Sequence, residues 1–160
     1  MTDTPELGPN DLLLVRKLKA PRNLIWRCWT TPDLLMQWFC PRPWMVSKCT
    51  IDLRPGGVFF THMRGPDEGQ EHPNYGLYLE VVPETRLVFT DALTEGWRPA
   101  ETPFMTAIVE FSDLPEGGTL STSRALHRNA EDRERHVAMG FEAGWGAAAV
   151  QLDELALSLM

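Results

Sequence analysis

The sequence contains no apolar run of the roughly 18 residues that a membrane-spanning helix needs. Its first residues also lack the basic and apolar segments of a signal peptide. The three cysteines, Cys28, Cys40 and Cys49, form no CxxC pair, and an odd number of separated thiols is typical of reduced cysteines in the cytosol. These absences predict a cytoplasmic protein in which each cysteine is a small buried side chain.

Clusters of basic residues are also missing, and the formal net charge is −7. An acidic chain without a basic patch is not expected to take nucleic acid as its main partner. The histidines, His62, His72, His127 and His136, form neither an HExxH nor an HxH pattern, so no metal site is predicted. No GxSxG turn, phosphate-binding glycine loop or dinucleotide fingerprint occurs. The sequence therefore predicts no cofactor and identifies no catalytic residue.

The length of 160 residues suits one domain with a sizeable core. We expect a single domain over residues 1–160, in which residues 1–10 are a flexible leader. Segments of β-forming residues separated by turn residues predict strands at 11–19, 44–52, 57–63, 75–82, 86–91, 104–112 and 119–126, with loops at 64–74 and 92–103. Helices are predicted to begin at Pro21 and Pro32. Short turns favour an antiparallel meander, and the order of elements favours an α+β domain with helices on one face of a curved sheet.

The C-terminal segment 131–160 carries the clearest pattern in the chain. Apolar residues recur at every third or fourth position, at Ala138, Phe141, Trp145, Ala148, Leu152, Leu155 and Leu159. This spacing forms one stripe along an α-helix. Asn129 is a candidate N-cap, with Asp132 in the position of a capping-box acid. Because the stripe must pack against a broad apolar surface, the sequence predicts a sheet wrapped around one long C-terminal helix.

Gly140, Gly144 and Gly146 all fall in the first half of this predicted helix. Each costs about 1 kcal/mol relative to alanine in a helix interior, so a physical reason for them is expected. One interpretation is a kink or a close contact with the sheet. The other is that this half of the helix covers a cavity, with Phe141 and Trp145 pointing inward. The sequence leaves both interpretations open.

A series of short motifs runs along the chain from about Leu12 onwards. The motifs are Pro21–Trp29, Thr31–Asp33, Gln37–Phe39, Asp52–Gly57, Gly76–Val81, Pro83–Thr90, and Gly140–Phe141 with Gly144–Gly146. The series resembles the START/Bet v 1-like (SRPBCC) superfamily, and within it the branch named for the activator of heat-shock-protein-90 ATPase. The resemblance implies a helix-grip fold, in which an antiparallel sheet of about six to seven strands curls around the C-terminal helix, with two short helices after the first strand. It implies less about function, because one fold hosts many activities.

Members of this superfamily hold an apolar or aromatic small molecule between the sheet and the helix, so the resemblance also implies a ligand site. The family pattern turns the aromatic residue of the GGxF motif inward and so selects Phe59, whereas the parity of the strand around Tyr78 is left unsettled. The candidate ligand-binding residues are Trp38, Phe59, Thr61, Met63, Tyr78, Phe89, Asp91, Ser121, Ser123, Phe141 and Trp145. A mostly apolar pocket with a few polar groups is typical of small-molecule sites. The alternative is that these aromatic side chains fill the core, and the sequence does not decide between the two.

Two further residues have competing interpretations. His127 follows the last predicted strand, where it could act as a general acid or base together with Asp91, or lie on the surface. Trp97 lies in the long loop 92–103, which could be a lid or an interface element, or could pack against the sheet edge.

Three hypotheses for function follow. The first is a cytoplasmic protein that binds an apolar or aromatic small molecule between the sheet and the C-terminal helix. The second is an enzyme of the polyketide cyclase/dehydratase type that uses the same cavity, which would require two titratable groups within hydrogen-bonding reach. The third, implied by the name of the branch, is a protein-interaction module that regulates a chaperone ATPase. A homodimer is compatible with the superfamily, and no membrane partner is expected.

Overall fold

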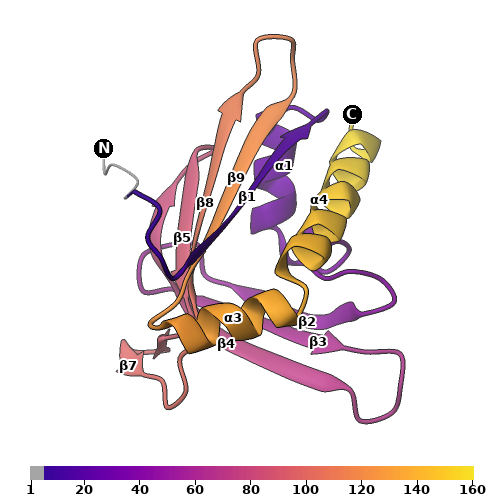
Figure 1. Cartoon of the computed structure of the whole chain (residues 1–160). Coiled ribbons are helices and arrows are strands. Elements are labelled where there is room, and N and C mark those ends of the chain that lie inside the picture. Colours follow the sequence, from indigo (N-terminus) through magenta and orange to yellow (C-terminus); the bar gives the residue numbers. More distant parts are fainter. Residues whose placement is uncertain (1–5) are drawn as a thin grey trace.

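The computed structural model describes residues 6–160, and its centre is a seven-stranded antiparallel sheet (Figure 1). The strands lie side by side in the order β1-β9-β8-β5-β4-β3-β2. Their bounds are Asp11–Leu18 (β1), Met45–Ile51 (β2), Val58–Arg64 (β3), Glu71–Val82 (β4), Arg86–Thr90 (β5), Thr106–Asp113 (β8) and Thr119–Leu126 (β9). A separate hairpin consists of Leu93–Thr94 (β6) and Arg98–Pro99 (β7). Strands that follow each other in the sequence pair as neighbours along most of the sheet, which confirms the predicted meander.

The helices gather on one side of this curved sheet. Their bounds are Arg22–Thr30 (α1), Pro32–Leu35 (α2), Ala130–Ala138 (α3) and Phe141–Ser158 (α4). α4 packs against α1 and against β1, so the sheet curls around the C-terminal helix (Figure 1). The fold is the α+β helix-grip architecture that the sequence predicted, with two short helices after the first strand.

The prediction of one continuous helix over 131–160 is wrong, because the segment forms the two helices α3 and α4. Asn129 caps α3 as predicted, since its side chain accepts a hydrogen bond of 2.8 Å from the Asp132 backbone N–H. The chain then turns at Gly140, whose φ of +88° lies in the left-handed region that glycine adopts readily. One of the three glycines therefore interrupts the helix.

The apolar stripe predicted from the sequence is present in α4. Phe141, Ala148 and Leu152 are buried, Trp145, Leu155 and Leu159 are half-buried, and Ala138 on α3 is exposed. The stripe therefore begins after the break. Burying a large apolar side chain contributes about 1.5–3 kcal/mol, and this packing holds α4 within the curve of the sheet.

Two predicted loops contain more structure than expected. β4 begins at Glu71 rather than at Tyr75, and residues 71–74 pair with β3. These residues are polar and largely exposed, so no apolar alternation marks them as a strand. The predicted loop 92–103 contains the β6–β7 hairpin, in which Gly96 and Trp97 both have a positive φ.

Residues 6–10 of the predicted leader 1–10 fall within the described part of the chain. Residues 1–5 lie outside the described residues, whereas the carbonyl of Asn10 accepts hydrogen bonds from both the backbone and the side chain of His127. Cys28 and Cys40 are buried and Cys49 is half-buried, all three as free thiols. Within residues 6–160, no helix has the length and the apolar character needed to cross a bilayer.

Replacing Gly140 by alanine tests the origin of the helix break. Gly140→Ala is expected to lower the free energy of unfolding by about 1–2 kcal/mol, because a residue with a Cβ is strained in the left-handed region. Gly144→Ala is the matched control, since an added Cβ there would meet Pro41 Cγ at an ordinary 3.8 Å. It is expected to stabilise the protein by about 0.5–1 kcal/mol through helix propensity. Urea denaturation measures the free energy of unfolding of both variants. If both variants changed it in the same direction, the left-handed conformation of Gly140 would not explain the break.

Candidate functional site

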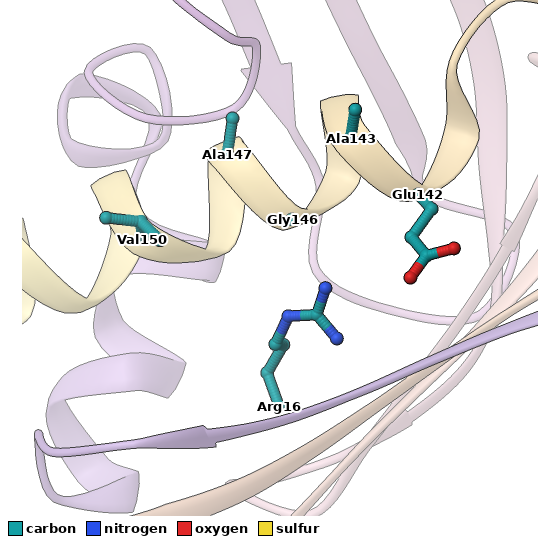
Figure 2. A pocket seen from close by; sticks show the side chains of 6 residues that line it. All are labelled: Arg16, Glu142, Ala143, Gly146, Ala147 and Val150. Atoms are coloured by element: carbon teal, nitrogen blue, oxygen red, sulfur yellow. The ribbon is translucent and has the colours of Figure 1, made fainter.

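A groove runs along the first half of α4 beside the edge strand β1 (Figure 2). Its volume is about 560 Å³, and it is open to solvent. The residues that line it are Arg16 on β1 and Glu142, Ala143, Gly146, Ala147 and Val150 on α4. Apart from Arg16 and Glu142 the lining is small or apolar. The groove therefore combines an apolar wall with one cation and one carboxylate.

Gly146 explains how the groove accommodates the side chain of Arg16. A Cβ added at Gly146 would lie 3.2 Å from Arg16 Nη2, which is closer than ordinary contacts. Figure 2 shows the guanidinium directed from β1 toward this turn of α4. The glycine thus allows a close approach by a large side chain, which was one of the reasons considered from the sequence. Gly140, in contrast, breaks the helix.

Arg16 was not selected from the sequence, although a signal for it existed. Leu12, Leu14 and Leu18 are buried on one face of β1, and Arg16 is in phase with them. Ser121 on β9 lies directly opposite Arg16 in the strand register. Opposed residues of antiparallel strands share a face, so the predicted inward position of Ser121 is confirmed and Arg16 lies beside it.

The predicted aromatic residues of the sheet form a packed layer instead of an open wall. The rings of Phe59 and Tyr78 stack at 5.0 Å, and Phe89 meets Phe59 edge-on at 4.9 Å. Trp29 of α1 completes the layer, and its ring centroid lies 4.7 Å from that of Trp38 and 6.0 Å from that of Phe89. The space between the sheet and α1 is therefore filled by side chains. The role of these residues as ligand contacts stays a prediction.

This aromatic layer contains two buried donors without an acceptor among the described residues. They are the Tyr78 hydroxyl and the Trp29 indole Nε1–H. Tyr78 is 0% exposed, and burial holds the pKa of its hydroxyl well above the usual range. Buried polar groups nearly always have a partner, so each of these donors is a position where an acceptor atom would be stabilised. Tyr78 is among the residues predicted from the sequence, and Trp29 is not.

The remaining predicted residues lie in separate places. Thr61 is buried and accepts a hydrogen bond of 3.3 Å from Asn74, whereas Met63 and Ser123 are half-buried. Phe141 and Trp145 lie together at the start of α4, with ring centroids 4.5 Å apart. The structure thus brings the predicted residues together in groups and not around one cavity.

Asp91 does not contribute a polar group to a pocket with His127. Its Oδ1 accepts hydrogen bonds from the backbone N–H groups of Phe104 and Met105, at 2.8 and 3.0 Å. These bonds fix the chain as it enters β8. The predicted pairing of Asp91 with His127 is wrong, because both ring nitrogens of His127 are engaged by other groups, the Asn10 carbonyl oxygen and His136 Nδ1.

His127 pairs instead with His136 of α3, and both imidazoles are buried. His127 Nδ1 lies 2.7 Å from the Asn10 carbonyl oxygen, and its Nε2 lies 2.9 Å from His136 Nδ1. A carbonyl can only accept, so His127 Nδ1 is the donor, and a neutral His127 must accept from His136 at Nε2. This chain of hydrogen bonds joins β9, α3 and the segment before β1.

The rings of Phe104, Phe141 and Trp145 surround His136, with centroids at 5.0, 5.0 and 5.6 Å. Burial, and to a smaller extent the neighbouring His127, lowers the pKa of His136 to about 4. The imidazole is therefore neutral at pH 7. Neither histidine lines the groove.

Trp97 contacts the turn between β2 and β3. Its ring lies against Gly56, at a place where a Cβ would collide with it. More than half of the Trp97 side chain remains exposed, at 55%. The contact agrees with the interpretation that this loop packs on the sheet, and the loop does not line the groove.

The buried state of His136 predicts a loss of stability in acid. This histidine is half protonated near pH 6.5 in the unfolded chain and near pH 4 in the folded chain. The stability contributed by neutral His136 is therefore present above about pH 6.5, declines below it, and is lost once the pH has fallen through about 4. The loss is on the order of 3 kcal/mol. His136→Phe should flatten the profile between these values in urea denaturation, whereas His72→Gln at an exposed site should not. If the free energy of unfolding changed with pH equally in the wild type and in His136→Phe, His136 would not be the source of the acid sensitivity.

Comparison with known proteins places this geometry in a family. The model described as Activator of Hsp90 ATPase homolog 1-like protein matches residues 19–156. A search of curated proteins finds no match. A crystal structure of a protein from Nitrosomonas europaea is 45% identical, with a TM-score of 0.91, over 96% of this chain and 98% of that one.

More distant structures share the architecture. A protein from Mycobacterium smegmatis is 27% identical, with a TM-score of 0.76, over 91% of this chain and 89% of that one. A protein from Aeromonas hydrophila described as AHSA1-like is 19% identical, with a TM-score of 0.71, over 93% of each chain, and it supports the fold alone. The family model covers most of the chain, so this protein belongs to the Activator of Hsp90 ATPase homolog 1-like family, within the START/Bet v 1-like superfamily.

Proposed function

We propose that this protein binds an apolar or aromatic small molecule between the sheet and α4, in the groove along β1. The observation that carries the proposal is the groove itself. Its volume of about 560 Å³ is within the range of roughly 300–1,000 Å³ typical of small-molecule pockets. Its wall on α4 offers Ala143, Ala147 and Val150 to an apolar ligand.

The size of the apolar wall sets the expected affinity. A two-ring aromatic molecule that buries about 200–300 Å² of apolar surface gains roughly 5–7 kcal/mol at about 25 cal/mol per Å². The loss of translational and rotational freedom offsets much of this gain. We therefore expect dissociation constants in the high-micromolar to millimolar range.

The geometry favours binding over catalysis. An enzyme of the polyketide cyclase/dehydratase type needs titratable groups that converge where the ligand lies. His127 and His136 are hydrogen-bonded to each other, but they lie among the rings of Phe104, Phe141 and Trp145 and neither lines the groove. Asp91, the carboxylate among the predicted polar residues, uses its Oδ1 to accept hydrogen bonds from two backbone N–H groups.

Fluorescence titration with N-phenyl-1-naphthylamine, a neutral aromatic probe, tests the proposal. We expect saturable enhancement in the wild type. Gly146→Leu should weaken binding about tenfold or more, because its side chain extends into the groove, while leucine is a good helix former. Glu154→Leu, at an exposed position of α4 outside the lining, is the matched control and should bind as the wild type does.

Two results would contradict the proposal. An absence of saturable binding would reject a small-molecule site for this class of ligand and direct attention to protein partners. Binding that is unchanged in Gly146→Leu but weakened in Tyr78→Phe would place the ligand in the aromatic layer between the sheet and α1, where the Tyr78 hydroxyl has no acceptor within residues 6–160.

A further inference from the structure

Arg16 interrupts an otherwise apolar row on the inner face of β1. Its neighbours in phase, Leu12, Leu14 and Leu18, are 8%, 6% and 5% exposed. A leucine at this position would continue the row and pack under α4. Instead, the chain has a permanent positive charge there, and Gly146 leaves space for it. Such departures from the local pattern are often found at functional sites.

The guanidinium of Arg16 has unused donors. It makes one hydrogen bond within the described part of the chain, from Nη1 to the Val15 carbonyl oxygen at 3.0 Å. It forms no ion pair among residues 6–160. A guanidinium carries five N–H groups in a planar fork, so most of them are available to a ligand in the groove. Nη2, on the side of Gly146, is one of these.

Glu142 is the nearest charge of opposite sign among the groove-lining residues. It is exposed in the first turn of α4, where a carboxylate interacts favourably with the helix dipole. Figure 2 shows its carboxylate at the same opening as the Arg16 guanidinium. A ligand anion that reaches Arg16 would therefore experience repulsion from Glu142.

We infer that the natural ligand of the groove is an apolar or aromatic molecule with one carboxylate, which pairs with Arg16 while Glu142 limits its affinity. The inference rests on the proposed function, because the apolar body of the ligand occupies the same groove. A planar carboxylate matches the guanidinium fork with two parallel hydrogen bonds. Ser121, opposite Arg16 on β9, supplies a hydroxyl on the same face.

The selectivity comes from Arg16 and not from the charge of the whole protein. With a formal net charge of −7, the long-range field repels an acid. Among the groove-lining residues, Arg16 is the group whose charge favours the acid over its neutral analogue. A comparison of two ligands that differ in that one group therefore isolates the contribution of Arg16.

The test titrates the protein calorimetrically with 1-naphthoate and, separately, with 1-naphthamide, which keeps the shape of the acid without its charge. We expect the wild type to bind the acid about five- to tenfold more tightly than the amide, as partly screened charge-assisted hydrogen bonds allow. Arg16→Gln should weaken the binding of the acid until its dissociation constant equals that of the amide. The dissociation constant of the amide should stay within about twofold of its wild-type value. Glu142→Gln should tighten the acid about two- to threefold without affecting the amide.

Arg27→Gln, at an exposed position of α1, is the control and should keep the wild-type ratio. Equal affinities for acid and amide in the wild type would overturn the inference and leave the proposed function intact. A preference for the acid that survives Arg16→Gln would also overturn it, because the anion would then bind elsewhere. If neither compound binds and the neutral probe also fails, the proposed function itself is rejected. Glu142→Gln, on an exposed side chain, keeps the test decisive if Arg16→Gln does not fold.

Discussion

The attachment of the second half of α4 to the rest of the domain is the constraint on which the site depends. The carboxylate of Asp153 accepts hydrogen bonds of 2.9 Å from the backbone N–H groups of Lys19 and Ala20, just after β1. On the other side of the helix, Gln151 donates to the carbonyls of Trp38 and Cys40 and accepts from residue 42. These bonds hold α4 between two loops. Its first half meets β1 through apolar packing, in which Phe141 and Trp145 cluster with Leu12 and Leu14, and the groove lies along this half.

The aromatic layer explains why the groove is at the edge of the sheet and not deep within it. The short helix α1 inserts Trp29 between the sheet and the helices, where it meets Trp38, Phe89 and Phe111. Packing at this density leaves little free volume. By contrast, the small residues Ala143, Gly146 and Ala147 of α4 line the groove beside β1. The place where a ligand fits is therefore set by side-chain size as much as by the course of the backbone.

Most of the fold could be predicted from the sequence, and less of the site could. The period of the C-terminal stripe and the turn residues between strands reflect local rules, so they identified the strands and the final helix. The break at Gly140 was missed because the apolar spacing in the sequence runs from Ala138 to Phe141 without interruption, although Ala138 is exposed in the structure. The pairing of His127 with His136 and the opposition of Arg16 to Gly146 depend on contacts between distant segments. No local period encodes such contacts, although the phase of β1 did place Arg16 among inward-facing residues.

The position of β1 at the edge of the sheet has a consequence for its dynamics. Within residues 6–160, its one strand neighbour is β9, so a single ladder of backbone hydrogen bonds holds it in the sheet. Edge elements of this kind open locally at a smaller free-energy cost than central strands. A molecule wedged between β1 and α4 binds only the closed arrangement, and by mass action it makes opening less frequent. A higher occupancy of the groove therefore means a smaller population of molecules in which β1 has detached from β9.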